Sequence, residues 1–369
     1  MIVLSIPTMF TAVGPEKFAA IIGIIIPLWA VFMVILERFF PYTKGIKLFR
    51  RGFWLDLVWY TIIQSYVLQI LIFDMIIKPI KLYFSISEQG VISHWNFGLI
   101  VLFFFVLHDF YIYWFHRLQH NNKYLWRTHE AHHSVREVDW LAGSRSHFIE
   151  IIINQTIEFL PIVLLLDAET AMYVVPIKAL IDALWGMWIH ANVGVNTGKL
   201  QYLINGPEMH QWHHANHEEV FYKNYSTKIA VWDWIFGTAF LPKLKPLSFY
   251  FNRPVMFGLP YSYPRGFFSQ TWYAIRRYDF KEIEQNSIYG QILNIRKVLS
   301  TQILGLFKVN KNWVENELFD NNNVKYQDDE TTHLCPKCQS KMKYFYQKNQ
   351  FVSVCESCDL THENLAKFN

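Results

Sequence analysis

The chain has 369 residues, of which 52% are hydrophobic and 18% aromatic, while only 17% are charged. This balance predicts an integral membrane protein. The net charge of +4 does not require a nucleic-acid partner, because basic loops on the inner side of a membrane account for it.

Five apolar runs each approach the roughly 20 residues that a bilayer-spanning helix requires. The last two are joined by only a few polar residues, which predicts a helical hairpin that is either spanning or re-entrant. No charged segment precedes the first run and no small-residue cleavage site follows it, so we expect this run to be retained in the protein. The runs are Phe18–Leu36, Phe53–Phe73, Phe97–Phe115, Ile149–Leu166 and Met172–His190.

The loop charges predict the orientation of these runs. The loop after the second run carries little positive charge beyond Lys78 and Lys81, whereas the loop after the first is strongly basic. Because Lys and Arg gather on the cytoplasmic side, we expect the first loop, the histidine-rich ends of the later runs and the C-terminus to be cytoplasmic. The basic residues of the first loop are Arg38, Lys44, Lys47, Arg50 and Arg51.

Eight histidines form three short groups, and a ninth lies between the second and the third group. On a helix, spacings of three and four place side chains on one face, so we expect the imidazoles of each group to point in one direction and to bind a metal together. Neutral imidazole suits zinc, copper, iron and nickel, and this many nitrogens exceed the needs of one ion. The pattern predicts two metal ions. The histidines are His116 and His120; His129, His132 and His133; His190; and His210, His213 and His214.

Other interpretations of the histidines compete with this one. The stretch His129-Glu130-Ala131-His132-His133 satisfies H-E-x-x-H, the signature of zinc proteases, but a protease leaves the other groups unexplained. A histidine-rich metal transporter or sensor is a second alternative, although a transporter should place ionisable ligands near the membrane midplane. The single His94 and His108 are expected to be ordinary core residues.

The C-terminal third reads as soluble protein. Five prolines between residues 242 and 264 predict a loop-rich cap or linker. Two C-x-x-C knuckles separated by 16 residues then predict a zinc ribbon, with a rubredoxin-like iron site and disulfides as alternatives. A cytoplasmic location argues against disulfides. The knuckles are Cys335 with Cys338 and Cys355 with Cys358, and the expected domains are an anchor region (1–95), a catalytic core (96–242), a cap (243–330) and the ribbon (331–369).

Several motifs in the middle of the chain follow one another in a specific order. They resemble the fatty acid hydroxylase and sterol desaturase superfamily, and within it they are most similar to the alkylglycerol monooxygenases and their bacterial relatives. The resemblance covers roughly residues 97 to 242. The motifs are His108-Asp109-Phe110, Tyr113-Trp114-Phe115-His116, Trp126-Arg127-Thr128-His129, Trp188-Ile189-His190, Asn205-Gly206-Pro207, His210-Gln211-Trp212-His213-His214, Lys223-Asn224-Tyr225 and Phe236-Gly237-Thr238.

The resemblance implies an all-α membrane enzyme with two iron ions that uses O2 to hydroxylate or desaturate a long-chain lipid, such as an alkyl or acyl lipid, a sterol or a terpenoid. It implies eight of the histidines as iron ligands and His190 as a ninth, while Gly194 stands where some relatives carry a tenth. Electrons must come from outside the chain, from a reduced pterin or from a cytochrome or ferredoxin-type donor.

Further polar residues are candidates for supporting roles. Metal-bound imidazoles need partners that orient them, and a substrate path through the hairpin needs polar groups on its inner faces. Glu158 and Lys178 lie at similar depths, about 16 and 18 Å from the cytoplasmic ends at 1.5 Å per residue, so we expect them to pair. Candidates for orienting the ligands are Asp109, Glu130, Asp139, His147, Glu150, His217 and Asn224; candidates for the path are Asn154, Glu158, Lys178 and Asp182.

Overall fold

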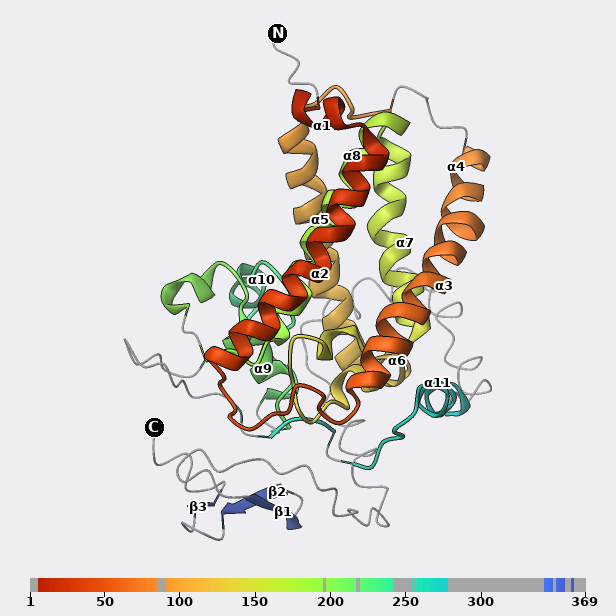
Figure 1. Cartoon of the computed structure of the whole chain (residues 1–369). Coiled ribbons are helices and arrows are strands. Elements are labelled where there is room, and N and C mark those ends of the chain that lie inside the picture. The colour runs from red at the N-terminus through yellow and green to blue at the C-terminus, as the bar shows by residue number, and fades with distance from the viewer. Residues whose placement is uncertain are drawn as a thin grey trace.

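Five helices in the computed structural model are long and apolar enough to cross a membrane, which confirms the five apolar runs. They run side by side through the upper part of the molecule (Figure 1). Their outward faces are apolar, with Ile24, Leu28 and Val31 of the first helix more than half exposed, as a lipid-facing surface requires. The helices are α2 (Pro15–Phe39), the continuous segment Leu55–Phe84, α5 (Phe97–Asn121), α7 (Phe148–Leu165) and α8 (Ala168–His190).

The structure describes most of the first 277 residues and three short strands near the C-terminus. The described ranges are 6–84, 90–194, 197–216, 220–241, 254, 256–259, 261–277, 342–347, 350–355 and 360–361.

The second spanning helix differs from the expectation in length and in winding. It continues through α4 (Lys78–Phe84), so Lys78 and Lys81 belong to a helix and not to the expected loop. Much of it has π-helical geometry, and the hydroxyls of Thr61 and Ser65 donate to carbonyl oxygens five residues earlier, at 2.8 and 3.2 Å. These hydroxyls satisfy carbonyl oxygens that the wider turns displace. The segment consists of η1 (Leu55–Gln64), α3 (Ser65–Ile70), η2 (Leu71–Ile77) and α4.

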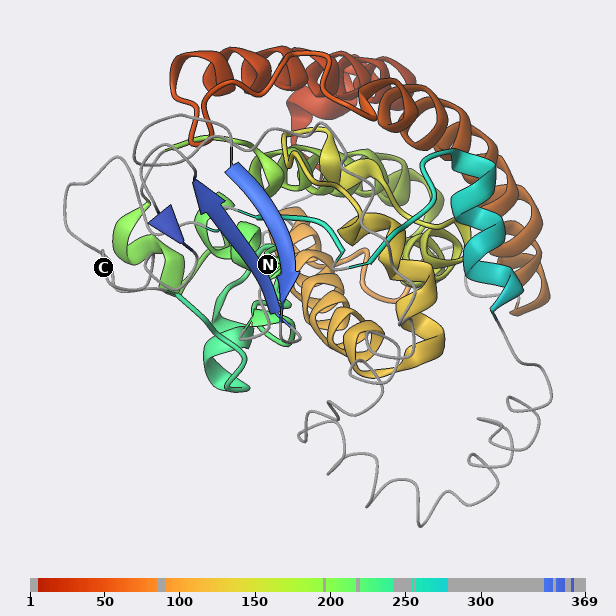
Figure 2. The same cartoon turned by 90° about the horizontal axis from the view of Figure 1, so that it is seen from below.

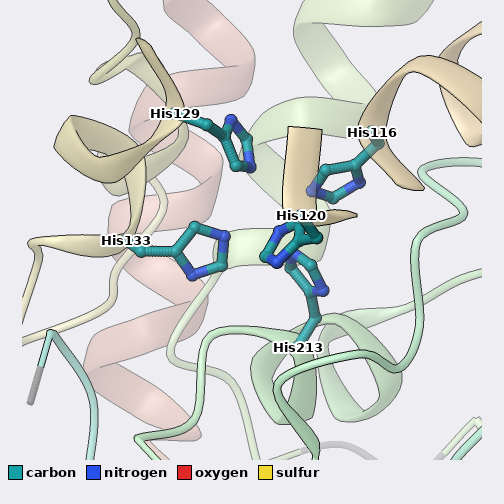
Figure 3. A group of neighbouring side chains, drawn as sticks. All are labelled: His116, His120, His129, His133 and His213. Atoms are coloured by element: carbon teal, nitrogen blue, oxygen red, sulfur yellow. The ribbon is translucent and has the colours of Figure 1, made fainter. Parts of the chain in front are cut away.

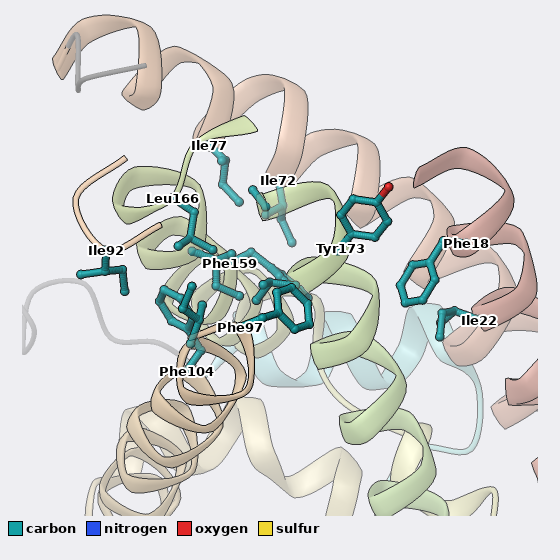
Figure 4. Close-up of a cluster of buried hydrophobic side chains, with 14 of the residues drawn as sticks. Phe18, Ile22, Ile72, Ile77, Ile92, Phe97, Phe104, Phe159, Leu166 and Tyr173 are labelled. Atoms are coloured by element: carbon teal, nitrogen blue, oxygen red, sulfur yellow. The ribbon is translucent and has the colours of Figure 1, made fainter. Parts of the chain in front are cut away.

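A hydrophobic core joins the long helices at the end where α1 (Thr8–Val13) lies (Figure 4). Each long helix contributes at least one buried side chain to this core. Helices that are distant in the sequence therefore pack against one another. Representatives are Phe18 of α2, Ile72 of η2, Phe97 of α5, Ile162 of α7 and Tyr173 of α8.

Short helices cap the opposite end of the bundle (Figure 1). One of them, α6, carries the second histidine run; its first turn is capped by Asn122, whose side chain accepts from two backbone amides. Another, α11, interrupts the stretch that was expected to be rich in loops. The cap contains α6 (Lys123–His133), η3 (Ala142–Ser144), η4 (Gly198–Tyr202), α9 (Pro207–His213), α10 (Val231–Ile235) and α11 (Phe267–Arg276).

Three C-terminal strands form an antiparallel sheet in the order β1-β2-β3, seen in Figure 2. They are β1 (Met342–Gln347), β2 (Gln350–Cys355) and β3 (Leu360–Thr361), and Met342 pairs with Cys355. Cys335, Cys338 and Cys358 lie outside the described residues, as does the side chain of Cys355. The zinc ribbon therefore remains a prediction.

Candidate metal centre

Nine buried histidines gather into two groups at the capped end of the bundle. Within each group, one ring nitrogen from every histidine lies within 4.8 Å of all the others. The larger group is shown in Figure 3, where rings from three helices, α5, α6 and α9, point toward one another. The first group is His116, His120, His129, His133 and His213; the second is His132, His190, His210 and His214.

His116 and His120 both belong to the first group, as expected of one run. The second and third runs are each divided between the two groups, so the expectation that each run points in one direction is wrong for these two. Successive residues of an α-helix point about 100° apart, so His132 and His133 face different groups. His129 shares a face with His133 because the two are four residues apart. The angle between successive residues likewise separates His213 from His214 at the end of α9.

In the second group the Nε2 atoms converge on one point. His190 Nε2 lies 3.0 Å from that of His210, 3.1 Å from that of His214 and 3.4 Å from that of His132. Around an ion with metal–nitrogen bonds of about 2.1 Å, tetrahedral or octahedral ligands would be roughly 3.0–3.4 Å apart. The spacing fits a shared cation.

In the first group each ring keeps its Nε2 buried and without a hydrogen-bond partner. Rings of this group are fixed from the other side by hydrogen bonds at Nδ1. His116 Nδ1 donates to the Tyr225 carbonyl oxygen at 2.8 Å, and His213 Nδ1 donates to that of Lys223 at 2.8 Å. Such bonds place the proton on Nδ1 and leave the Nε2 lone pair available to a metal.

A carboxylate performs the same task for His129. Glu150 Oε1 accepts from His129 Nδ1 at 3.0 Å, and both side chains are buried. Among the expected orienting carboxylates, Glu150 thus contacts a histidine of the first group. His190 Nδ1 is held by the Gly186 carbonyl oxygen at 2.7 Å.

Burial keeps the cap histidines neutral. It lowers the pKa of His213 to about 3, and it lowers the pKa of His132, His133, His210 and His214 well below the usual value, with the neighbouring imidazoles adding to the effect. Neutral imidazole is the form that binds metals.

Glu130 does not face the histidines. It accepts from the Tyr261 hydroxyl at 2.6 Å and forms an ion pair with Arg277, and it is completely buried. A carboxylate so engaged is not available as the general base of a zinc protease, so that alternative fails. Tyr261 and Arg277 lie more than 130 residues along the chain, and nothing in the sequence pointed to them.

The other expected supporting residues hold the backbone of the cap. Asp109 accepts from the backbone amides of Lys228 and Ile229 at 3.1 and 3.0 Å. Asn224, which has a positive φ of 58°, bonds to backbone atoms of Met209 and Phe240.

Three further histidines of the described part of the chain, His94, His108 and His147, and the carboxylate of Asp139 lie apart from both groups. Asp139 accepts from Arg50 at 2.6 Å. His147 accepts from the Ile149 amide at 3.2 Å and caps α7. His94 is exposed, and so is not the core residue that was expected, whereas His108 is buried as expected. His217 lies outside the described residues.

Gly143 supports the second group. A Cβ at this position would lie 2.6 Å from Nδ1 of His190, so only glycine lets this ring pack where it does. Sequence reasoning missed this residue, because a glycine in a loop carries no signal of its own.

A cavity of about 340 Å³ leads from the histidines into the bundle. His129, His190 and His210 are among the residues that line one part of it, and Asn154, Glu158 and Asp182 line another. His190 lies eight residues after Asp182 on α8, as His116 lies eight after His108 on α5, so the polar part is about 12 Å deeper in the bundle.

Lys178 contacts three of the residues that line that polar part, although it does not line the cavity itself. Its Nζ donates to Glu158 Oε1 at 2.9 Å, to His108 Nδ1 at 2.8 Å and to Asp182. The expected pairing of Glu158 with Lys178 is therefore confirmed. His108, Glu158 and Asp182 have a spacing that could suit a metal, but the ammonium group already supplies the cation. Lys228 makes a further ion pair with Asp182 at 2.7 Å.

Comparison with known proteins agrees with the geometry. Residues 101–238 match the family described as fatty acid hydroxylase. The ornithine lipid hydroxylase of Rhizobium tropici is 29% identical over 192 residues, which are 52% of this chain and 55% of that protein. Human alkylglycerol monooxygenase is 32% identical over 130 residues, 35% of this chain and 28% of that protein.

Methylsterol monooxygenase 1 of Rattus norvegicus is 28% identical over 150 residues, 39% of this chain and 49% of that protein. The chain thus spans between 28% and 55% of the length of these relatives. No solved structure matches. The segment from residue 101 to residue 238, which contains all nine histidines of the two groups, is thus similar to the fatty acid hydroxylase family.

Proposed function

We propose that the two histidine groups hold two iron ions and that the chain is an O2-dependent monooxygenase that hydroxylates a long-chain membrane lipid. The observation that carries the proposal is the convergence of nine buried histidines into two adjoining groups beside a cavity that enters the bundle. Rings of the two groups come close to each other: those of His133 and His214 have centroids 4.6 Å apart. Bound iron would supply the activation of O2 that oxidation of an unactivated C–H bond requires.

The donor set favours iron over zinc. A structural zinc takes four ligands, often with thiolates, whereas the first group offers five imidazoles and no sulfur among the described residues. The protein's own contribution is to orient the ligands and to exclude water. Glu150 and the carbonyl oxygens of Tyr225 and Lys223 fix the rings, and burial limits the access of bulk solvent to them.

The cavity supports a lipid as the substrate. Ile112, Phe115 and Ile151 give part of its wall an apolar surface, and the charged cluster around Lys178 adjoins its deeper part. By their names, the matched relatives act on ornithine lipids, alkylglycerols and methylsterols. We propose that an alkyl segment of the substrate lies along the apolar wall, with a polar group of the same molecule near Asn154, Glu158 and Asp182.

Three further parts of the proposal concern the surroundings of the enzyme. The histidine groups and the C-terminus face the cytoplasm, which the basic loop between the first two spans supports. The electron donor is external, a reduced pterin or a cytochrome or ferredoxin-type protein. The C-terminal cysteines hold one zinc ion in a separate ribbon.

The proposal is tested by metal analysis together with O2-dependent product formation. The protein is solubilised mildly, its iron and zinc are counted per chain, and lipid products are measured by mass spectrometry in cells with and without it. We expect two irons per chain and oxygenated lipid only in cells that contain the protein. Comparison of the two lipid extracts also identifies the substrate.

Single substitutions then connect the metals with the reaction. His213→Ala and His214→Ala each remove a ligand from a different group, so each should lose product and the iron of its own group. His94→Ala is the matched control, because His94 is an exposed histidine outside both groups. Wild-type turnover in His213→Ala, or active protein containing zinc alone, would contradict the proposal.

A further inference from the structure

Two short elements of the cap, η4 and α10, expose apolar side chains next to one another. Leu203 and Ile235 are 58% and 63% accessible, compared with 53% for Leu102 on the lipid-facing side of α5. The rings of Tyr202 and Trp234 have centroids 4.8 Å apart, so the two elements share one surface. The exposed apolar residues of this surface, the η4–α10 patch, are Leu200, Tyr202, Leu203, Ile204, Trp234 and Ile235.

The two elements of the patch contain few charged residues. Lys199 is the one charged residue of η4, and it stands in the first turn of that helix. Asp233, the one charged residue of α10, is completely buried, and its carboxylate accepts from the backbone amides of Tyr225 and Ser226 at 2.9 and 2.8 Å. A continuous apolar patch of this kind indicates contact with a partner or with a membrane.

The contacts of α10 with α5 give the depth of the patch. Phe110 contacts the rings of Trp232 and Phe236 at centroid distances of 5.1 and 6.4 Å. Trp114, one turn farther along α5, contacts Phe236 at 4.8 Å. Because α5 begins at Phe97 and rises 1.5 Å per residue, Phe110 and Trp114 lie about 20 and 26 Å from its start. Both lie within the roughly 30 Å of the hydrocarbon core of a bilayer.

A second spanning helix gives the same depth. The starts of α5 and α8 are level with one another, because the Ser93 hydroxyl before α5 accepts from the backbone amide of Asp167, which caps α8, at 2.8 Å. The Trp185 indole of α8 donates to the carbonyl oxygen of Asn205, directly after the first half of the patch, at 3.2 Å. Since α8 begins at Ala168, Trp185 lies about 26 Å from its start. The patch therefore lies inside the hydrocarbon core, on the side of the membrane that bears the cap.

Backbone groups of the patch bond to one another, as a surface in lipid requires. The amide of Ala230 donates to the Leu203 carbonyl oxygen at 3.0 Å. The amides of Leu203 and Ile204 donate to the Leu200 carbonyl oxygen at 2.9 and 2.8 Å. Ile204 and Ile229 also form an antiparallel β-bridge, so the two halves of the patch are joined through the backbone as well as through the rings.

We propose that the η4–α10 patch is inserted into the membrane and contacts the acyl chains of the leaflet on the capped side, although neither element spans the bilayer. The patch continues the lipid-facing surface of α5, since Leu107 and Phe110 are exposed on that helix and Phe110 also contacts α10. Its exposed Tyr202 and Trp234 are of the residue types that gather near the membrane surface. The proposal concerns how the cap is seated in the membrane and does not rest on the proposed function.

The inserted surface adjoins the cavity that leads from the histidines. Ile229 pairs with Ile204 of the patch, and the two residues before Ile229, Thr227 and Lys228, line that cavity. One stretch of chain thus carries both the membrane-inserted surface and a part of the cavity wall.

The test is photo-cross-linking of the full-length, metal-loaded protein in nanodiscs of palmitoyl-oleoyl phosphatidylcholine. Ile235 and Leu203, one from each half of the patch, are replaced singly by p-benzoylphenylalanine, which inserts into nearby C–H bonds on illumination. The same replacement of Leu102 on α5 gives the reference for a lipid-facing position. Mass spectrometry of the tryptic peptides measures the lipid adducts.

Ser262, replaced in the same way, is the matched control for an exposed position outside the hydrocarbon core. It follows Tyr261, whose hydroxyl accepts from Trp126 Nε1 at 3.2 Å. The Trp126 ring contacts that of His120 at 5.0 Å, and His120 lies about 34 Å from the start of α5, beyond the roughly 30 Å of hydrocarbon.

We expect lipid adducts at Ile235 and Leu203 in amounts within about twofold of those at Leu102, and about tenfold fewer at Ser262, because acyl chains surround an inserted apolar surface. Lipid adducts at both patch positions that are no more abundant than at Ser262, while Leu102 is labelled, overturn the proposal. Cross-links that join two copies of the chain in place of lipid adducts also overturn it, because the patch is then a contact between copies.

Both patch positions are exposed, so the added ring displaces no packed side chain. Iron content and the midpoint of thermal unfolding, measured on each variant, establish that the variant is folded and loaded. Adduct formation reports contact with lipid and not turnover, so its failure with iron and product formation intact would leave the proposed function untouched.

Discussion

Replacing Lys178 by Met should destabilise the protein strongly. The ammonium group contacts Glu158, His108 and Asp182 inside the bundle, and the Lys178 side chain is only 2% exposed. Removing one member of a buried ion pair leaves the other charge unmatched and costs about 3–5 kcal/mol. That is a large share of the roughly 5–15 kcal/mol that stabilises a typical folded protein.

The assay is thermal unfolding in detergent, followed by tryptophan fluorescence at one fixed heating rate. At about 2–4 °C per kcal/mol, the midpoint should fall by at least roughly 6 °C. Lys199→Met is the matched control, because Lys199 is exposed and its replacement should leave the midpoint within about 2 °C of the wild type.

A double variant separates charge from packing. Glu158→Leu combined with Lys178→Met removes both charges, while Asp182 keeps its ion pair with Lys228 at 2.7 Å. Replacing a buried ion pair by apolar groups of similar volume is often neutral or stabilising, so the midpoint should recover most of the loss. A single variant as stable as the Lys199→Met control, or a double variant worse than the single one, would refute the electrostatic reasoning.

Three other outcomes follow from the same contacts. Gly143→Ala should displace the His190 ring, since the added Cβ would lie 2.6 Å from it, and metal analysis should then show loss of one ion of two. Tyr261→Phe should keep both metals but lower the free energy of unfolding by about 1–3 kcal/mol, because Glu130 loses a buried donor; an unchanged thermal midpoint would contradict this. Deleting residues 324–369 should leave two metals bound, which a count of iron per chain checks; loss of both would show that the C-terminal segment supports the centre.

The spanning helices and the histidines were predictable because both signals are local. An apolar run of sufficient length determines a spanning helix without reference to the rest of the chain. Histidines spaced by three or four residues are likewise recognisable on any helix. Glu150 could be proposed for the same reason, because it begins the next spanning helix after the second histidine run.

The partners of those residues were not predictable, because they are distant in sequence. The contact of Glu130 with Arg277 spans 147 residues. The sequence around a polar residue does not show which distant side chain it will contact. The exposure of His94 could not be foreseen either, since an isolated histidine beside an apolar run fits a core as well as a surface. The π-helical winding of the second span depends on side-chain bonds such as that of Thr61, which hydropathy does not record.

The division of the histidine runs links the two proposed metal sites mechanically. Because α6 gives His129 and His133 to one group and His132 to the other, any movement of this helix displaces ligands of both. Glu130, on the same helix, is held by Tyr261 and Arg277, which lie beyond the segment that matches the family. The cap segment therefore acts on both sites at once through one carboxylate, whereas α8, which supplies only His190, acts on the second site alone.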